Sequence, residues 1–353
     1  MRFEDVFTAA SVAARFTSDA SNAQAYLGAA LFPAQKKLGV DLKWIKAHRG
    51  LAVALKPSAF DAMSTIRPRN GFEMQATEMP LFRESMTVRE MDMLQIARAQ
   101  ESNDPYVMDV IRRLYNDAEE LREGAEVSAE RMRMQLLAPA NGNAVISIGM
   151  ADQTAYNYNY DPDSSWKATN YEAVNNVWST PATATPLTDI ANAKAALAAK
   201  GYEARYILMN SVTMKQMFAS NEVKNAFIVA SGANVGYVSE ARLREAVEAD
   251  TELTILVYDK QFIDYDGTTK KFYPNGYATV IAGEALGNTW YGTTPEEATL
   301  MTSDEADVAL YDNRIAVAQK VEYGPPVRRD TTVAQICLPS FEGMDGVYVL
   351  KVN

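Results

Sequence analysis

Apolar residues recur at steps of three and four positions through residues 104–138. Nine positions make up the series: Val107, Ile111, Leu114, Ala118, Leu121, Ala125, Ala129, Met132 and Leu136. This spacing places a single apolar stripe along an α-helix. Asp104 is a suitable N-cap, Pro105 fits the first turn, and a Pro-Ala-Asn-Gly cluster follows Ala138. The pattern predicts one helix over 104–138, which at about 1.5 Å per residue would be roughly 50 Å long.

The segments before this helix have a much weaker apolar pattern. Residues 1–35 are rich in Ala, Ser, Asn and Gln, with one marginal helix near 4–16, which favours an extended arm. Residues 36–95 contain short extended runs on both sides of Asn70 and Gly71, a pair that favours a tight hairpin turn. The flanking strands are too highly charged to fold on a core of their own. We therefore expect this hairpin to lie on another surface, such as a second subunit.

The segment after the helix, residues 140–185, has the pattern of strands. A short apolar run begins at Val145, and Tyr then alternates with Asn from Tyr156 towards Trp166. Alternation with a period of two gives a strand with one aromatic face. Ordinary cross-strand packing explains this face, and a sugar-binding aromatic platform is the functional alternative.

Residues 186–300 predict a compact region of mixed helices and strands. Helices are expected over 189–199, 211–219, 222–230 and 240–249, and strands over 204–209, 253–259 and 278–282. The expected helix N-caps are Thr188, Asn210 or Ser211, and Ser239, and Gly201 is expected to end the first of these helices. Turns are expected at 266–267 and 274–276. Closing strands are expected near 306–323, 331–338 and 346–352. Helices combined with antiparallel strands indicate an α+β fold and not a doubly wound sheet.

Composition and charge narrow the class of protein. The chain has 353 residues with 48% hydrophobic content, enough for a sizeable core, and its mean hydropathy is −0.21. No apolar run approaches the roughly 20 residues that span a bilayer. Of the net charge of −11, residues 141–353 carry −10, from 16 basic and 26 acidic residues. Sequence-specific DNA-binding proteins usually have a basic patch or stripe, so this function is not expected.

Candidate chemistry is sparse. The single His48 and single Cys337 form neither a catalytic triad motif nor a zinc site, and no Gly-rich phosphate loop occurs. Asp161, Asp163, Ser165 and Glu172 have calcium-loop spacing, but Trp166 stands where that loop needs glycine. Asp264 and Asp266 could serve acid–base chemistry, although a turn explains them equally well. We therefore expect no catalytic residue, no metal and no cofactor.

Several local motifs, taken in order, resemble a known family. They are Tyr158-Asn-Tyr-Asp with Trp166, the run from Gly201 to Asn210, Tyr265-Asp-Gly, Phe272-Tyr-Pro-Asn-Gly, Gly287, Tyr291-Gly292, and the closing strands from Val333 and Val347. Together with the arm, the charged hairpin and the long helix, this order resembles the major capsid proteins of tailed bacteriophages, in particular the lambda-like E family. The resemblance implies an α+β Hong Kong 97-type phage capsid fold with an N-arm, an E-loop, a peripheral domain carrying a long spine helix, and an axial domain.

The resemblance also implies a domain organisation. The implied segments are an N-arm at 1–35, an extended region with the E-loop at 36–95, a peripheral domain at 96–185 with its spine helix at 104–138, an axial domain at 186–304, and returning strands at 305–353. Such a protein would form hexamers and pentamers of an icosahedral shell around double-stranded DNA and would not be an enzyme. It would be located in the virion capsid after assembly in the host cytoplasm. An encapsulin-like compartment shell and an acidic α+β hydrolase are the alternatives.

The resemblance further implies which residues and partners take part in assembly. Five charged residues of the E-loop region are the expected intersubunit contacts: Arg67, Arg69, Glu73, Glu78 and Arg83. Copies of the chain, a separate scaffolding protein, a portal and a decoration protein are the expected partners, with packaged DNA bound without sequence specificity and no membrane. Some relatives join subunits by a Lys–Asn bond, for which Lys56 and Asn353 have suitable chemistry, but no motif supports that use here.

Overall fold

A computed structural model describes most of the chain. The described residues are 9, 10, 13, 26–46, 73–94, 106–149, 155–231, 239–283, 285–298, 306–324 and 326–353. The chain divides into two compact units, the first made of 1–43, 76–130 and 288–340, and the second of 44–75, 131–287 and 341–353. Both units are therefore assembled from segments that are distant in sequence. This division into two units does not test the predicted boundaries of the arm, the E-loop region and the peripheral and axial domains, which stay predictions.

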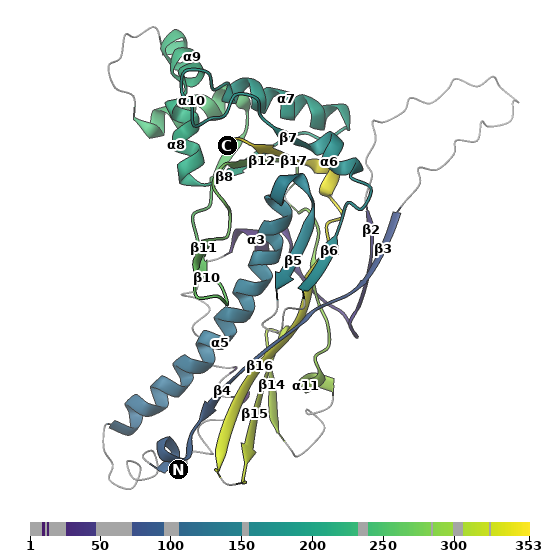
Figure 1. Ribbon diagram of the computed structural model, residues 1–353, viewed down its shortest axis with the longest axis vertical. Coiled ribbons are helices and arrows are strands. Elements are labelled where there is room, and N and C mark those ends of the chain that lie inside the picture. The colour runs from purple at the N-terminus through teal and green to yellow at the C-terminus, as the bar shows by residue number, and fades with distance from the viewer. Residues whose placement is uncertain are drawn as a thin grey trace, which may run out of the picture. The chain divides into compact units, whose positions relative to one another are not determined.

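The first unit is built on a sheet whose central strand is β16, Arg328–Pro339. The sheet also contains β1 (Ala34–Lys36), β4 (Leu81–Val88), β13 (Thr289–Tyr291), β14 (Asp307–Tyr311) and β15 (Ile315–Glu322). Strand β16 is antiparallel to β4 on one side and to β15 on the other, so residues 81–88 are paired within their own chain (Figure 1). The charged run around Phe82 therefore pairs with strand β16 of the same chain, which its sequence pattern alone did not indicate.

Helix α5, Tyr106–Leu137, is the long helix that the sequence predicts over 104–138. Ala118, Leu121 and Ala125 on its apolar stripe pack against the sheet of the first unit. The sheet residues in this cluster are Tyr311, Ile315, Val317, Val333 and the partly buried Met86. The stripe prediction is confirmed for these positions, while Asp104 and Pro105 lie outside the described residues.

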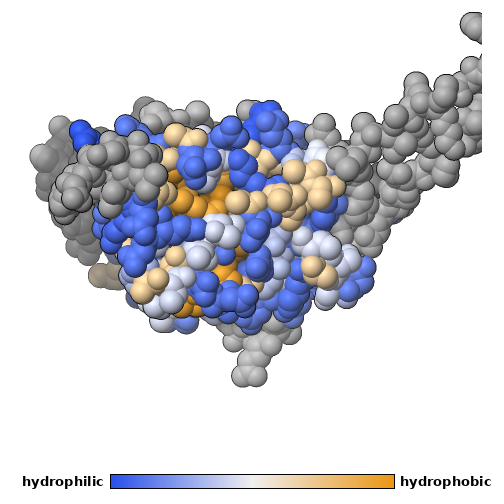
Figure 2. All heavy atoms as spheres, turned by 90° about the horizontal axis from the view of Figure 1, so that it is seen from above, coloured by the Kyte–Doolittle hydropathy of each residue, from blue (hydrophilic) through white to orange (hydrophobic). Residues whose placement is uncertain are grey.

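The second unit contains a five-stranded sheet covered by helices. Its strands, in spatial order, are β7 (Tyr171–Ala173), β17 (Val347–Lys351), β12 (Tyr277–Ile281), β8 (Tyr206–Met209) and β9 (Thr254–Val257). The helices are α6 (Ser165–Asn170), α7 (Pro186–Ala199), α8 (Ser211–Ala219), α9 (Asn221–Ser231) and α10 (Glu240–Thr251). Helices α7 to α10 lie over the sheet (Figure 1), and their outer face is mostly hydrophilic, with apolar side chains visible between the polar ones (Figure 2).

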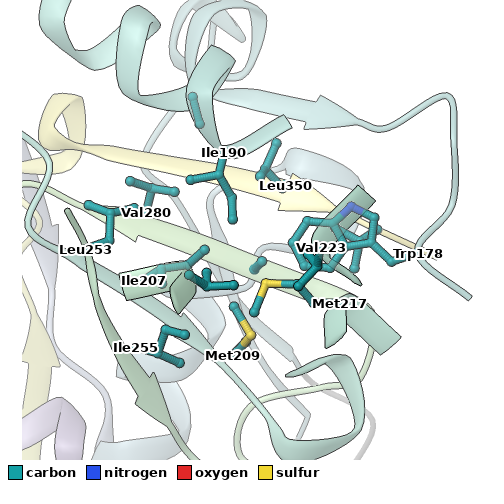
Figure 3. Packing of buried hydrophobic residues seen from close by; sticks show 14 of the residues in the cluster. Trp178, Ile190, Ile207, Met209, Met217, Val223, Leu253, Ile255, Val280 and Leu350 are labelled. Atoms are coloured by element: carbon teal, nitrogen blue, oxygen red, sulfur yellow. The ribbon is translucent and has the colours of Figure 1, made fainter. Parts of the chain in front are cut away.

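The core of the second unit fills the space between this sheet and its helices. Ile207, Val280 and Leu350 of the sheet point towards Ile190 of α7 and Met217 of α8 (Figure 3). All five side chains are almost fully buried. Because burying each such side chain contributes about 1.5–3 kcal/mol, this cluster supplies much of the stability of the unit.

Two smaller hairpins complete the second unit, and a further strand pair is described apart from the main sheets. The hairpins are β5 (Val145–Gly149) with β6 (Ala155–Asn159), and β10 (Gln261–Ile263) with β11 (Thr269–Lys271). The additional pair is β2 (Asp41–Lys46) with β3 (Glu73–Glu78). Short elements are α3 (Leu27–Leu31), α11 (Pro295–Ala298), η1 (Ala140–Gly142) and η3 (Met344–Gly346).

Two predicted elements need correction. The helix predicted at 189–199 begins at Pro186 after Thr185, because proline is well suited to the first helical position, and Thr188 bonds Glu222 instead of capping the helix. The strand region 306–323 is a hairpin, since Asp312 and Asn313 both have positive φ and turn the chain between β14 and β15. Other signals are confirmed: Asn210 caps α8, and Gly201 has φ of +81° just after α7.

Candidate assembly surfaces

The paired strands β2 and β3 form the base of the predicted E-loop. Residues 47–72, which connect them, lie outside the described residues, and this segment contains Arg67, Arg69, Lys56, His48 and the Asn70–Gly71 turn. Glu73 begins β3, where only the backbone is described, and Glu78 ends it with an exposed side chain. The structure therefore positions two of the five predicted contact residues on one strand.

Arg83, the fifth predicted contact residue, lies on β4 and already has a partner in its own chain. Its guanidinium is 2.5 Å from the carboxylate of Glu296 in α11, which is 4% exposed. Lys36 at the end of β1 pairs with the adjacent Glu297 at 2.6 Å. These two ion pairs join α11 to strands β1 and β4, which precede and follow the predicted E-loop in the sequence. A role for Arg83 between subunits remains a prediction.

The loop between β1 and β2 exposes apolar side chains next to these ion pairs. Gly39, with φ of +83°, accepts a hydrogen bond from the Thr293 N–H and donates its own N–H to the Thr293 hydroxyl. The carbonyl of Val40 accepts a hydrogen bond from the Met79 N–H, so the loop is fixed in place. Leu38 is exposed, as are Val40 and, less so, Leu81 at the start of β4. This part of the first unit therefore combines a small apolar surface with two partly exposed ion pairs.

A second ordered surface lies on the hairpin β10–β11. The carboxylate of Asp264 is buried and accepts hydrogen bonds from Arg131 of α5 at 2.7 Å and from Lys270 at 2.6 Å. Asp266 closes the turn by accepting a hydrogen bond from the Thr268 N–H at 2.9 Å. Burial alone would raise the pKa of Asp264, but these hydrogen bonds and cations lower it. The hydrogen bonds from Thr268 and Lys270 lower the pKa of Asp266 to about 2.

The same contacts decide the acid–base hypothesis for Asp264 and Asp266. Both carboxylates hold the turn in place and are kept ionised, whereas a general acid at neutral pH needs a raised pKa. In the described structure these carboxylates accept hydrogen bonds from the side chains of Arg131, Thr268 and Lys270 and from the backbone N–H groups of Tyr265 and Thr268. The turn interpretation of this pair is therefore confirmed.

The acidic residues that have calcium-loop spacing have other roles in the structure, one of them at the start of a helix. Asp161 accepts hydrogen bonds from the backbone N–H groups of Trp166 at 3.0 Å and Lys167 at 2.9 Å, the first turn of α6. Glu172 instead lies on β7, where it accepts a hydrogen bond from Tyr348. Among the described residues, no group of three or more His, Cys, Asp or Glu side chains is arranged to hold a metal ion.

The structure also bears on the single cysteine, on the alternating tyrosines and on the possibility of a membrane-spanning helix. Cys337 is buried in β16, as the apolar run around it predicts. Tyr156 and Tyr158 lie stacked on one face of β6, with ring centroids 6.1 Å apart, which is the predicted aromatic face. Within the described parts of the chain, no helix combines the length and the apolar character needed to cross a membrane.

Comparison with known proteins identifies the class. The chain aligns in structure with a prophage protein of Escherichia coli CFT073 assigned as a capsid protein, with a TM-score of 0.62, 11% identity, and coverage of 98% of this chain and 99% of the other. It also aligns with a phage-related protein of Bordetella bronchiseptica RB50, with a TM-score of 0.52, 12% identity and 96% coverage of both chains. No curated protein sequence matches it. The architecture is the α+β Hong Kong 97-type phage capsid fold.

The sequence family is more specific than the fold. A family model described as phage major capsid protein E matches residues 8–319, which is most of the chain. This chain belongs to the phage major capsid protein E family. Its role is structural, as a subunit of a virion shell, and the family identified from the order of sequence motifs is confirmed.

The contacts between Arg131 and hairpin β10–β11 could not be predicted from the sequence pattern. No pattern in the sequence singles out Arg131, whose guanidinium lies 5.7 Å from the ring centroid of Phe262 and 5.6 Å from that of Tyr265. A signal for the hairpin alone was available in the run Phe262-Ile-Asp-Tyr-Asp-Gly267, where bulky apolar residues occupy both faces of a strand that leads into a turn.

Proposed function

We propose that this chain assembles into hexamers and pentamers, which close into an icosahedral shell around the double-stranded DNA of a tailed phage. The observation that carries the proposal is the family match over residues 8–319. The matched region includes the β2–β3 pair, helix α5 and four of the five strands of the second unit's main sheet, whereas β17 lies beyond it. Rings of subunits with different contact surfaces on their two sides would build such a shell.

In this proposal the segments take the roles that the resemblance implies. Residues 1–35 are the N-arm, 36–95 include the E-loop, 96–185 belong to the peripheral domain, 186–304 to the axial domain, and 305–353 return through both. Arg67, Arg69, Glu73, Glu78 and Arg83 contribute intersubunit ion pairs. Each exposed pair contributes only about 0–1 kcal/mol, so these contacts act together and not singly.

The proposal extends to the partners and the place of assembly. A separate scaffolding protein, a portal and a decoration protein would act with the chain in the host cytoplasm, and the chain itself would have no enzymatic activity. The net charge of −11 suits a wall that does not bind DNA tightly, because like charges repel the packaged phosphates. Packaged DNA would be held without sequence-specific contacts.

Sedimentation of the full-length chain tests this proposal. We expect megadalton particles when the chain is produced alone or together with the scaffolding protein of its phage. A protein that stays monomeric at every concentration, with and without that scaffolding protein, would contradict the proposal. Particles that never enclose genomic DNA during infection would instead support the compartment alternative.

A further inference from the structure

Two Asn–Gly pairs lie in turns of the second unit. They are Asn141–Gly142, at the end of η1, and Asn275–Gly276, directly before β12. Both glycines have positive φ, +76° for Gly142 and +78° for Gly276, a backbone conformation that glycine adopts without strain. The turns therefore favour glycine at both positions, and an asparagine precedes it in each.

An Asn–Gly pair is the sequence at which an asparagine side chain is lost most readily, because glycine has no side chain to obstruct ring closure. The glycine nitrogen loses its proton to water and bonds to Cγ of the asparagine, and the side-chain nitrogen takes up a proton and leaves as ammonia. Water then opens the cyclic imide to aspartate or isoaspartate. Isoaspartate lengthens the main chain by one carbon atom, so it would displace a strand that follows the turn.

The side chain of Asn275 is open to this reaction. It is exposed to water, and its Oδ1 accepts hydrogen bonds from Nδ2 of Asn210 at 2.6 Å and from Nζ of Lys271 at 3.2 Å. Donors at this oxygen would stabilise the negative charge that develops on it when a nitrogen attacks Cγ. Resistance of this pair to deamidation therefore has to come from the glycine nitrogen.

The Gly276 nitrogen is held by Thr213 of α8. Its N–H donates to Oγ1 of Thr213 at 3.0 Å, and the Thr213 side chain is fully buried. The carbonyl of Gly276 accepts the Val352 N–H at 2.8 Å, and a Cβ on this glycine would lie 2.7 Å from Cβ of Asn353. The nitrogen would have to break its bond to Thr213 within this packed backbone before it could attack Asn275.

We propose that Thr213 is a positioning residue that protects the Asn275–Gly276 pair from deamidation. Its hydroxyl keeps the Gly276 N–H engaged, so the nitrogen is not available for attack. Isoaspartate at position 275 would disturb β12, which pairs with both β8 and β17 in the five-stranded sheet. This protection does not depend on how the chain assembles, but it suits a subunit of a virion shell, which is not renewed once the shell has formed.

The first test compares the full-length variants T213V and T213S with the natural sequence. Valine has nearly the shape of threonine but no hydroxyl, whereas serine keeps the hydroxyl. We expect deamidation at Asn275 to become about fivefold faster in T213V, because one hydrogen bond that holds the nitrogen is lost, and to stay unchanged in T213S. Peptide mapping by mass spectrometry after incubation of the folded proteins measures the rate. An unchanged rate in T213V would overturn the inference.

The Asn141–Gly142 pair is a matched control within the same molecule. The Gly142 N–H donates to the Pro139 carbonyl at 3.1 Å, a contact that T213V does not alter. In guanidinium chloride both pairs should deamidate rapidly, whereas in folded T213V only Asn275 should do so. Equal acceleration at both pairs in T213V would overturn the inference. A folded natural protein that loses Asn275 as fast as the unfolded chain would also overturn it.

A second variant separates protection by Thr213 from general loosening of the second unit. Ile190 lies in the core of this unit, and I190V weakens the fold without touching Gly276. Thermal unfolding compares the stability of I190V with that of T213V. We expect Asn275 to deamidate in I190V at the rate of the natural sequence. A rate in I190V that equals the rate in T213V, at matched stability, would contradict a specific role for Thr213.

Discussion

Asp161 shows how one side chain decides between a functional and a structural interpretation. Its carboxylate accepts the N–H groups of Trp166 and Lys167 at the start of α6. We expect Asp161→Ala to lower the free energy of unfolding by about 1–2 kcal/mol, because these buried donors lose their acceptor. Urea denaturation measures the loss. Asp163→Ala is the matched control, since Asp163 is exposed and its contact with the first N–H of α6, that of Ser165, is longer at 3.3 Å. Equal losses in both variants would contradict this role.

The Asp264 network predicts how stability depends on pH. Its pKa is lowered from 3.8 in the folded protein, so the ionised carboxylate stabilises the fold fully above that value, and the contribution is lost as the pH falls through the lowered pKa. We expect Asp264→Asn to be less stable at neutral pH and to lose less stability than the natural sequence as the pH falls below about 4. Urea midpoints measured at several pH values test this. Parallel pH profiles of the two proteins would contradict it.

At the scale of single elements, strand β9 shows how an edge of a sheet is protected. It ends the five-stranded sheet, and Ile255 on it donates its N–H to Glu248 at 2.9 Å and accepts a hydrogen bond from Arg244 at its carbonyl. Arg244 and Glu248 also bond each other across one turn of α10. The pair thus occupies backbone groups that another strand would otherwise bind.

Removing this pair should open the edge. We expect R244A/E248A to aggregate faster than the natural sequence in light-scattering measurements, with little change in the melting temperature, because water can replace the lost bonds at an exposed edge. R242A/E245A is the matched control, since both side chains are exposed on the same helix. Equal aggregation of the two double variants would show that Arg244 and Glu248 have no protective role.

Helix α5 is the element on which the first unit depends. Leu121 is buried against the sheet, and an interior proline there costs about 3 kcal/mol and kinks the helix. We expect Leu121→Pro to yield no particles, whereas Leu121→Met, which nearly conserves volume, should assemble. Electron microscopy of cell extracts distinguishes the two results. Normal particles from Leu121→Pro would refute the role of the helix in assembly.

The same elements show what could be predicted from the sequence. Helix α5, the Asn210 cap and the turn at Gly267 follow from local periodicity and turn chemistry, which act over a few residues. The pairing of β4 with β16 joins residues about 245 positions apart, as Ser85 and Thr332 do at 2.7 Å, and no local pattern specifies it. The ion pairs of Arg131 and Arg83 escaped prediction for the same reason, because their partners are brought near only by the fold.

At the scale of the whole molecule, sequence order was more informative than any single motif. The family follows from an arm, a charged hairpin, a long helix and two strand-rich regions in a fixed succession, and it is confirmed over residues 8–319. The predicted contact residues Arg67 and Arg69 lie outside the described residues, so their role stays a prediction. Among the described residues, the carboxylates considered for acid–base chemistry and for calcium binding hold a turn and a helix start: Asp264 and Asp266 hold the turn, and Asp161 accepts hydrogen bonds at the start of α6.

Electron microscopy of particles assembled from the full-length chain tests the central claim most directly. The account predicts closed icosahedral shells in which the density resolves both six-fold and five-fold rings of this subunit, with α5 as a continuous helix. A purified protein that forms no such rings, alone or with the scaffolding protein of its phage, would contradict it.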